Sequence, residues 1–315
     1  MAWQRPWAKA PDGEHPIGEA NDACVTTPTR IIGAAIGVGA QDTRCQYGPD
    51  GLCEAGIIDR LQGLSPAIVW DRFVRPDMAI ADSDAPAQIV TFCERLAAVV
   101  APIVAQDKRV WVVGGDHSCA IGTWSGASAG LNGPLGLIWV DAHMDSHTPA
   151  TSPSSAVHGM PLACLLGYGP ASLVELGGPS PKLRPENVCL VGVRNFEPEE
   201  ARLLDELGVR VFHIDEVKRR GLSVVMHEAL DRCQRQTAGF GLTIDLDAID
   251  PVDAPGVGSP ESGGIYGKDL AKSLEQIGDH PNLVGVEIAE FNPDKDIDSK
   301  TAELVYRLLA SMVGK

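Results

Sequence analysis

Short apolar runs rich in β-branched residues alternate along most of the chain with longer segments of helical periodicity. Runs of the first kind predict strands, and segments in which apolar residues recur every three or four positions predict helices. The predicted strands cover residues 30–38, 108–115, 135–142, 187–194, 209–214, 239–247 and 283–291. The predicted helices cover residues 86–106, 197–207, 221–236, 267–277 and 299–313.

Alternation of this kind indicates a mostly parallel sheet, because parallel strands need crossover connections and bury both of their faces. We expect a single-domain, three-layer α/β/α fold over residues 29–315. Residues 1–28 carry four prolines and no periodicity, so we expect a poorly ordered N-terminal extension there. Open sheets bind ligands outside the carboxyl ends of their strands, so functional polar residues are expected at those ends.

Composition narrows the range of partners. The chain has 42 acidic and 26 basic residues, and its net charge of -16 repels phosphate backbones and anionic lipids. Nucleic acid and membranes are therefore excluded as expected partners, and a small cationic molecule fits better. The N-terminus lacks the apolar centre of a secretory signal, and the longest apolar run, 96–105, is shorter than the ~20 residues that span a bilayer. We expect a cytoplasmic protein.

The eight cysteines form no C-x-x-C pair and no tight cluster. We expect most of them to be reduced core thiols, with a thiolate metal site or a disulfide framework as the alternative.

Carboxylate and imidazole side chains follow four of the predicted strands. A lone Asp at a strand end is usually a helix cap, but this many acids in one cleft would raise one another's pKa values unless a cation lay among them. One divalent metal ion, or more readily two, removes the conflict. Oxygen and imidazole donors without thiolate suit Mn²⁺, with Zn²⁺, Ni²⁺ or Co²⁺ as alternatives. The residues concerned are Asp116, His117, Asp141, His143, Asp145, His147, Asp245, Asp247, Asp250 and Glu290.

In two segments these side chains occupy every second position. If the strands continue through them, the alternation directs Asp141, His143 and Asp145 to one side, and Asp245 and Asp247 likewise. Two metal ions about 3.5 to 4 Å apart could share these carboxylates and activate a water molecule near neutral pH. The residues by themselves therefore predict a dinuclear metal hydrolase.

Five motifs follow one another along the chain. They are GGDHS (114–118), DAHMD (141–145), VHGMP (157–161), DLDAIDP (245–251) and EIAEFNP (287–293). In this order they resemble the ureohydrolase family, which comprises arginases, agmatinases and other guanidino-acid hydrolases. The resemblance extends from about Thr29 to the C-terminus, and segments 151–169 and 253–265 look especially like bacterial arginases.

The resemblance implies two Mn²⁺ per subunit, with Ni²⁺ or Co²⁺ as alternatives, and a homo-oligomer, either a trimer or a hexamer. It implies that His158 shuttles protons to the leaving amine and that Glu290 fixes the substrate guanidinium, a planar fork that pairs bidentately with a carboxylate. Asp145 is expected to act in catalysis as well as in metal binding. The implied ligands are His117, Asp141, Asp145 and Asp245 for one ion and Asp141, His143, Asp245 and Asp247 for the other, with Asp141 and Asp245 bridging.

The positions that face the far end of the substrate depart from the arginase pattern. His147 stands where arginases carry Asn, Ala156 lies in a segment where they have SGN, and Glu197 stands where they place Asp. The alternative for the acids near 197–200 is the solvated first turn of a helix. The implied tail contacts are His147, Ser154 and Ser259 for a carboxylate, and Glu197 and Glu200 for an α-ammonium group.

We expect hydrolysis of L-arginine to L-ornithine and urea. The alternatives are another guanidino substrate, such as guanidinobutyrate, agmatine or a small guanidine, and a non-catalytic ureohydrolase-like subunit. A deacetylase would use fewer carboxylates, and a phosphoesterase would show Arg or Lys beside the ligands. The glycine-rich segment 33–40 has the wrong spacing for dinucleotide binding and is expected to form a tight turn at the rim of the cleft.

Overall fold

The protein is built around one central sheet. A computed structural model describes residues 27–77, 79–80 and 84–313, so the predicted extension falls almost wholly outside the described residues. Every pair of neighbouring strands in the sheet is parallel. The strands are β1 (Thr29–Ala34), β2 (Ile68–Val74), β3 (Arg109–Gly114), β4 (Leu135–Val140), β5 (Leu183–Val193), β6 (Arg210–His213), β7 (Gly239–Asp245) and β8 (Leu283–Ala289).

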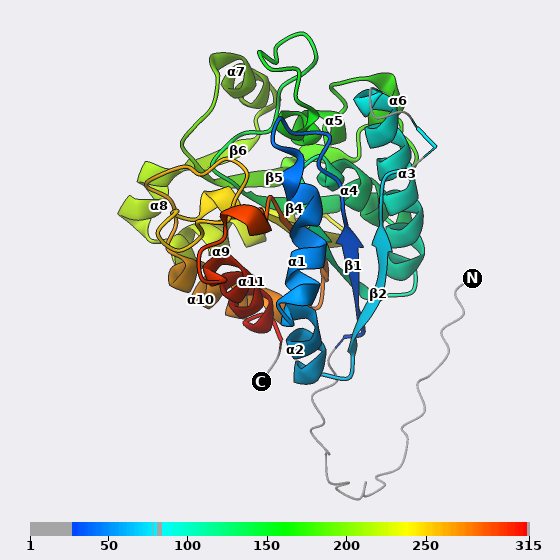
Figure 1. The fold of residues 1–315 in the computed structure, drawn as a ribbon. Coiled ribbons are helices and arrows are strands. Elements are labelled where there is room, and N and C mark those ends of the chain that lie inside the picture. Colours follow the sequence, from blue (N-terminus) through cyan, green and yellow to red (C-terminus); the bar gives the residue numbers. More distant parts are fainter. Residues whose placement is uncertain (1–26, 78, 81–83, 314–315) are drawn as a thin grey trace, which may run out of the picture.

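The strands lie in the order β2-β1-β3-β8-β7-β4-β5-β6, with helices on both faces of the sheet (Figure 1). The longer helices are α1 (Gly48–Glu54), α2 (Ile57–Leu64), α3 (Ala85–Val104), α4 (Cys119–Gly130), α7 (Pro198–Leu207), α8 (Ile214–Arg220), α9 (Leu222–Cys233), α10 (Gly267–Gly278) and α11 (Lys300–Ala310). Short helical segments are η1 (Thr43–Tyr47), η2 (Val157–Gly159), α5 (Pro161–Leu165), α6 (Ala171–Val174), η3 (Leu246–Ala248) and η4 (Pro293–Lys295).

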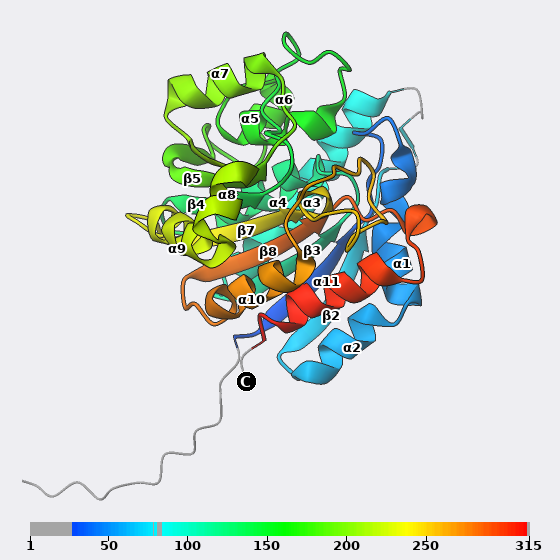
Figure 2. The same ribbon diagram turned by 90° about the vertical axis from the view of Figure 1, so that its left-hand side faces the viewer.

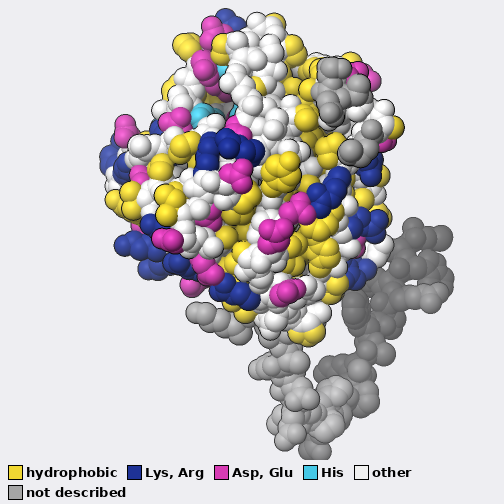
Figure 3. All heavy atoms as spheres, in the orientation of Figure 1, with side chains coloured by type: hydrophobic (Ala, Val, Ile, Leu, Met, Phe, Trp, Pro, Cys, Tyr) yellow, Lys and Arg dark blue, Asp and Glu magenta, His cyan; other side chains and the backbone are white. Residues whose placement is uncertain are grey.

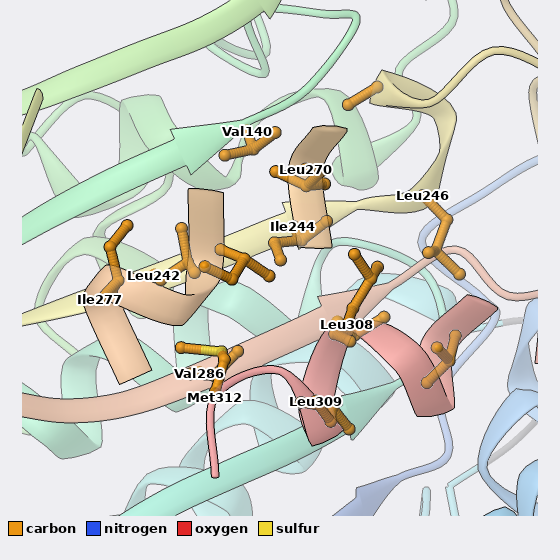
Figure 4. Close-up of a cluster of buried hydrophobic side chains, with 14 of the residues drawn as sticks. Val140, Leu242, Ile244, Leu246, Leu270, Ile277, Val286, Leu308, Leu309 and Met312 are labelled. Carbon is orange, nitrogen blue, oxygen red and sulfur yellow. The ribbon is translucent and has the colours of Figure 1, made fainter. Parts of the chain in front are cut away.

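Two apolar cores lie on opposite faces of the sheet, because successive strand residues point to opposite sides. Val113 and Ile138 face α1, α2 and α8 to α11, whereas their neighbours Val112 and Trp139 face α3 and α4. Figure 2 shows α2, α10 and α11 on the side of the sheet turned to the viewer. In Figure 4 leucine and isoleucine side chains of α10 and α11 pack on those of β7. These layers confirm the predicted α/β/α fold.

Helix α3 is long and apolar enough, by length and composition, to cross a membrane. Its packing accounts for this character, because it lies tightly along α4 in the second core. A Cβ added at Gly122 or Gly126 of α4 would come within 2.8 or 2.7 Å of carbonyl oxygens of α3. The small residues that permit this approach leave α4 without a polar face, and for that reason its periodicity did not predict a helix.

Several elements differ from the sequence-based expectations. Strand β2 was not predicted, because this edge strand is only partly buried and Asp71 and Arg72 interrupt its apolar pattern. The helices α1, α2, α4 and α8 were also not predicted. The expected continuation of two strands through their acidic residues is wrong. Strand β4 ends at Val140 and β7 ends at Asp245, so loops and turns position the side chains that follow.

Candidate metal centre

Four strands that end in titratable residues lie next to one another in the middle of the sheet. They are β3, β8, β7 and β4, and their carboxyl ends lead into His117, Glu290, Asp245 and Asp141 respectively. Because neighbouring parallel strands end at the same edge, residues more than 170 positions apart become neighbours: the backbone N–H of His117 donates to Glu290 Oε1 over 3.0 Å with a sequence separation of 173. The site lies where open α/β sheets bind ligands.

The imidazole of His117 points into a group of three carboxylates. Its Nδ1 lies 3.3 Å from Asp141 Oδ2, 3.0 Å from Asp145 Oδ2 and 3.1 Å from Asp245 Oδ2. Among the described residues, His117 Nδ1 and Asp145 Oδ2 are buried without a hydrogen-bond partner. Lone pairs that converge on one point without a proton between them fit a bound cation.

A second group lies on the other side of Asp141. His143 Nδ1 lies 3.0 Å from Asp247 Oδ2 and 3.5 Å from Asp141 Oδ1. Asp141 thus contributes to both potential metal-binding groups, as a bridging ligand would. Asp245 belongs to the first of these two groups and meets the second through a hydrogen bond from the backbone N–H of Asp247, so its predicted bridging remains a proposal. The two groups together support a binuclear divalent metal site.

The charges of these groups conflict unless cations balance them. Burial, followed by the charges of Asp247 and Asp141, raises the pKa of Asp245 well above its usual value. Burial and the charge of Asp141 also raise the pKa of Asp145 to about 6. Asp141 differs: although burial would raise its pKa, the neighbouring imidazoles of His117 and His143 lower it. Divalent cations relieve this repulsion and keep all the carboxylates ionised, so the donor set fits two such ions.

A buried relay behind His117 orients its ring. Thr243 Oγ1 donates to Glu287 Oε1 over 2.9 Å and therefore accepts from His117 Nε2, which lies 3.1 Å away. The proton of the neutral ring is thereby held on Nε2, so that the Nδ1 lone pair is directed at the three carboxylates. Sequence reasoning missed both Thr243 and Glu287. Glu287 could have been found from the sequence, because a carboxylate inside an otherwise apolar strand indicates a buried polar contact.

Glu290 and His158 form a buried pair beside the metal groups. His158 Nδ1 lies 3.0 Å from Glu290 Oε1. Although burial lowers the pKa of His158, the hydrogen bond and the charge of Glu290 raise it to about 9. Correspondingly, burial would raise the pKa of Glu290, but His158 lowers it. An imidazolium is therefore held next to a carboxylate at neutral pH.

A cleft of about 380 Å³ opens over this pair. Its lining includes Ser154 and Ser259, which were predicted as tail contacts, together with Gln41 and Asp42, which were not predicted. The backbone carbonyl of Gly39, which precedes the cleft-lining residues Gln41 and Asp42, accepts a hydrogen bond from the backbone N–H of His158. The face of the molecule shown in Figure 3 carries histidine atoms close to acidic side chains.

Two of the candidate acids have structural roles. Asp116 accepts hydrogen bonds from the backbone N–H groups of Gly39 and Ser118, and a Cβ at Gly39 would lie 2.6 Å from Asp116 Oδ1. This close approach explains the glycine and supports the predicted tight turn. Asp250 accepts from three backbone N–H groups in the loop that follows β7. Neither acid belongs to the potential metal-binding groups.

The predicted tail contacts His147, Glu197 and Glu200 lie together, but they bind one another. His147 Nε2 lies 3.0 Å from Glu197 Oε2 and 3.4 Å from Glu200 Oε2, and its Nδ1 lies 3.2 Å from Thr151 Oγ1. Both glutamates also form the capping box at the start of α7, so they begin a helix as the alternative had it, but Glu200 is buried rather than solvated. Burial raises the pKa of Glu200 to about 8.

The cysteines of the described residues are free thiols, and six of the seven are buried. This confirms the prediction of reduced core thiols for those six, whereas Cys53 is only partly buried and Cys24 lies outside the described residues.

Known proteins share both the sequence and the fold. The sequence model of the Arginase family matches residues 28–314. An arginase of Bacillus caldovelox is 36% identical over 304 residues, which are 91% of this chain and 98% of that protein. An arginase of Brevibacillus brevis is 37% identical over 289 residues, with 90% and 97% covered. The crystal structure of an arginase from Bacillus subtilis matches with a TM-score of 0.84 at 35% identity, covering 91% of this chain and 98% of that one. As its motifs predicted, the chain belongs to the arginase family.

Proposed function

We propose that this protein hydrolyses the guanidinium group of L-arginine to give L-ornithine and urea. Family membership makes the chain a hydrolase of C–N bonds in linear amidines, and the choice of substrate is the proposed part. One observation carries the proposal: the hydrogen bond between the His117 backbone and Glu290 joins the metal groups to a carboxylate that lines the cleft. A guanidinium held by that carboxylate would lie beside the metal ligands.

We propose Mn²⁺ at both metal positions, with Ni²⁺ or Co²⁺ as alternatives, because the donors are carboxylate oxygens and imidazole nitrogens. When bound, two such ions lower the pKa of water and so supply a nucleophile near neutral pH. Asp145 would also hydrogen-bond the attacking water. The proposed ligands are His117, Asp141, Asp145 and Asp245 for one ion, and Asp141, His143, Asp245 and Asp247 for the other.

Glu290 would bind the substrate guanidinium, and His158 would protonate the leaving nitrogen. The Glu290 carboxylate would hold the planar guanidinium through paired N–H bonds. Attack of water on the central carbon forms a C–O bond, and the bond from that carbon to the nitrogen of the substrate chain then breaks. Both protons of the water end on that nitrogen, directly or by way of His158, which is thereby reprotonated. The leaving nitrogen needs a proton, which His158 can supply because the pKa of its imidazole is raised to about 9.

The residues expected to contact the substrate tail support L-arginine in part. Ser154 and Ser259 line the cleft and can donate to a carboxylate. Glu197 and Glu200 could receive an α-ammonium, but His147 competes for both. That competition favours a second candidate, a guanidino compound without an α-ammonium group, such as guanidinobutyrate or a small guanidine. Agmatine remains a third candidate. A non-catalytic subunit is disfavoured, because every proposed metal ligand and the Glu290–His158 pair are present.

Steady-state kinetics with added Mn²⁺ or Ni²⁺ test the substrate. L-arginine is compared with 5-guanidinopentanoate, which differs only by lacking the α-amino group, and with agmatine, guanidinobutyrate and guanidine. The arginase proposal expects the highest kcat/KM for L-arginine. A kcat/KM for L-arginine at least tenfold below that for the des-amino analogue would reject L-arginine as the substrate and leave guanidine hydrolysis standing.

We further propose that residues 29–315 form the catalytic unit of a cytoplasmic homo-oligomer, a trimer or a hexamer. Light scattering on the metal-loaded protein measures the subunit number directly, and a monomer would reject this part.

A further inference from the structure

Three groups hold the carboxylate of Glu290. The backbone N–H of His117 and the ring of His158 both engage Oε1, each over 3.0 Å. The thiol of Cys45 donates to Oε2 over 3.1 Å and lies 3.6 Å from the carbonyl oxygen of Glu290. Cys45 belongs to η1, 245 residues away in the sequence, and its side chain is fully buried. The mechanism above gives this contact no role.

The lone pairs of the carboxylate explain why the contact matters. Each oxygen of a carboxylate has two acceptor directions. Both directions of Oε1 are filled, whereas Cys45 fills one direction of Oε2. The remaining direction of Oε2 is therefore where an incoming guanidinium N–H can bind first. A second N–H reaches Oε1 only when His158 turns aside.

The residues around Glu290 restrict the position of its carboxylate. A Cβ added at Gly258 would lie 2.5 Å from Glu290 Oε2 and 3.1 Å from Cys45 Sγ, so the carboxylate has little room to move on that side. Glu290 itself has a φ of 66°, a left-handed conformation that a non-glycine residue rarely adopts. Burial and then the charge of Glu290 raise the pKa of Cys45, so the thiol keeps the proton that it donates.

We propose that Cys45 is a positioning residue for guanidinium binding: its thiol holds Oε2 of Glu290 so that the remaining acceptor direction faces the cleft. The inference rests on the proposed role of Glu290. The other buried thiols that donate hydrogen bonds do so elsewhere: Cys93, Cys119 and Cys233 donate to Ser118, Glu287 and Leu137 respectively.

The test compares Cys45→Ala, Cys45→Ser and Cys164→Ala in the full-length, metal-loaded protein. The Ala variant removes the donor, the Ser variant keeps one, and Cys164→Ala controls for the cavity left by a buried thiol, because Cys164 is equally buried but lies in α5. Two binding readouts are used: KM for the best guanidino substrate, and the calorimetric affinity for millimolar guanidinium chloride. Metal content and thermal unfolding are measured on every variant.

Loss of one hydrogen bond should weaken both readouts about fivefold in Cys45→Ala, with kcat and metal content changing less than twofold. Cys45→Ser and Cys164→Ala should stay within twofold of the parent. Equal binding by Cys45→Ala and the parent would overturn the inference, and so would a loss in Cys45→Ser as large as that in Cys45→Ala. Guanidinium binding needs no turnover. A parent that binds guanidinium but hydrolyses no guanidino compound would therefore reject the proposed function separately.

Discussion

His147 donates from Nε2 to Glu197 Oε2 over 3.0 Å, and its imidazole is buried. An α-ammonium group of a substrate would have to share or displace this donor at Glu197. The contact should therefore disfavour substrates that carry an α-ammonium group relative to those that lack it. A substitution at residue 147 tests this effect on specificity.

His147→Asn should raise the kcat/KM for L-arginine relative to 5-guanidinopentanoate by about tenfold. The shorter amide frees a carboxylate acceptor, and hydrogen bonds to charged groups contribute about 1.5 to 3 kcal/mol. His227→Asn, on the exposed face of α9, is the control. Kinetics with both substrates give the ratio, and an unchanged ratio in His147→Asn would show that this contact does not govern specificity.

Asp245→Ala should lose most of its bound metal and all turnover, because Asp245 is proposed to bridge two ions and its carboxylate lies 3.1 Å from His117 Nδ1. Asp141→Ala should behave alike, whereas His117→Ala should weaken one ion more than the other. Elemental analysis after dialysis gives the metal content, with exposed Asp231→Ala as control. Two full equivalents of metal in Asp245→Ala would contradict the ligand assignment.

His158→Asn should keep both metal ions and lower kcat by about 10² to 10⁴, the range typical of a general acid. The parent should also lose activity as the pH rises towards the pKa of about 9, because the deprotonated imidazole cannot protonate the leaving nitrogen. The pH profile of kcat/KM, which reports the pKa values of the free enzyme, checks this in both proteins. A variant as fast as the parent at every pH would exclude the proton-donor role.

Thr243→Val should weaken metal binding by about 10- to 100-fold, the usual cost of removing a partner behind a metal-binding histidine. The valine leaves His117 Nε2 without its acceptor and separates it from Glu287. Competition calorimetry measures the affinity, and Ser128→Ala on α4 controls for loss of a hydroxyl. Unchanged affinity in Thr243→Val would mean that the relay does not orient the ring.

The His158–Glu290 pair should also stabilise the metal-free protein in a pH-dependent way. Folding raises the pKa of His158 from 6.5 to about 9, so the pair contributes fully below pH 6.5 and its contribution is lost as the pH rises to about 9. In EDTA, the difference in Tm between the parent and His158→Asn should therefore shrink over that window. A difference that stays constant from pH 6 to 9.5 would contradict it.

The sequence predicted well which acids and histidines gather at the carboxyl ends of the strands, because these residues follow strands with clear apolar patterns. It could not predict the partners that depend on strand order. Thr243 and Glu287 lie inside apolar runs, and they meet only because β7 and β8 are neighbours. Cys45 was classed as a core thiol, since nothing local links it to a residue 245 positions away.

Elements at the edge of the sheet or inside the core escaped prediction for a different reason. Periodicity reveals a segment only when one of its faces meets water and the other meets the core. Helix α4 has no polar face, and strand β2 has a mixed one. His147, Glu197 and Glu200, which the sequence suggested as tail contacts, do lie together, but a motif does not display their mutual contacts or the capping of α7.

The position of β8 makes assembly of the proposed metal site depend on the last strand of the sheet to be synthesised. This strand is the last in the sequence, yet it lies between β3 and β7, so His117 and Asp245 flank a gap until it is inserted. A nascent chain that has reached Asp247, just after β7, already carries all six proposed ligands, but β3 and β7 still lack the neighbour that they share. Pairing so distant in sequence forms late in folding. A chain that ends before β8 should therefore bind the metal ions weakly. The proposed ligands are held together only once β8 pairs with both β3 and β7.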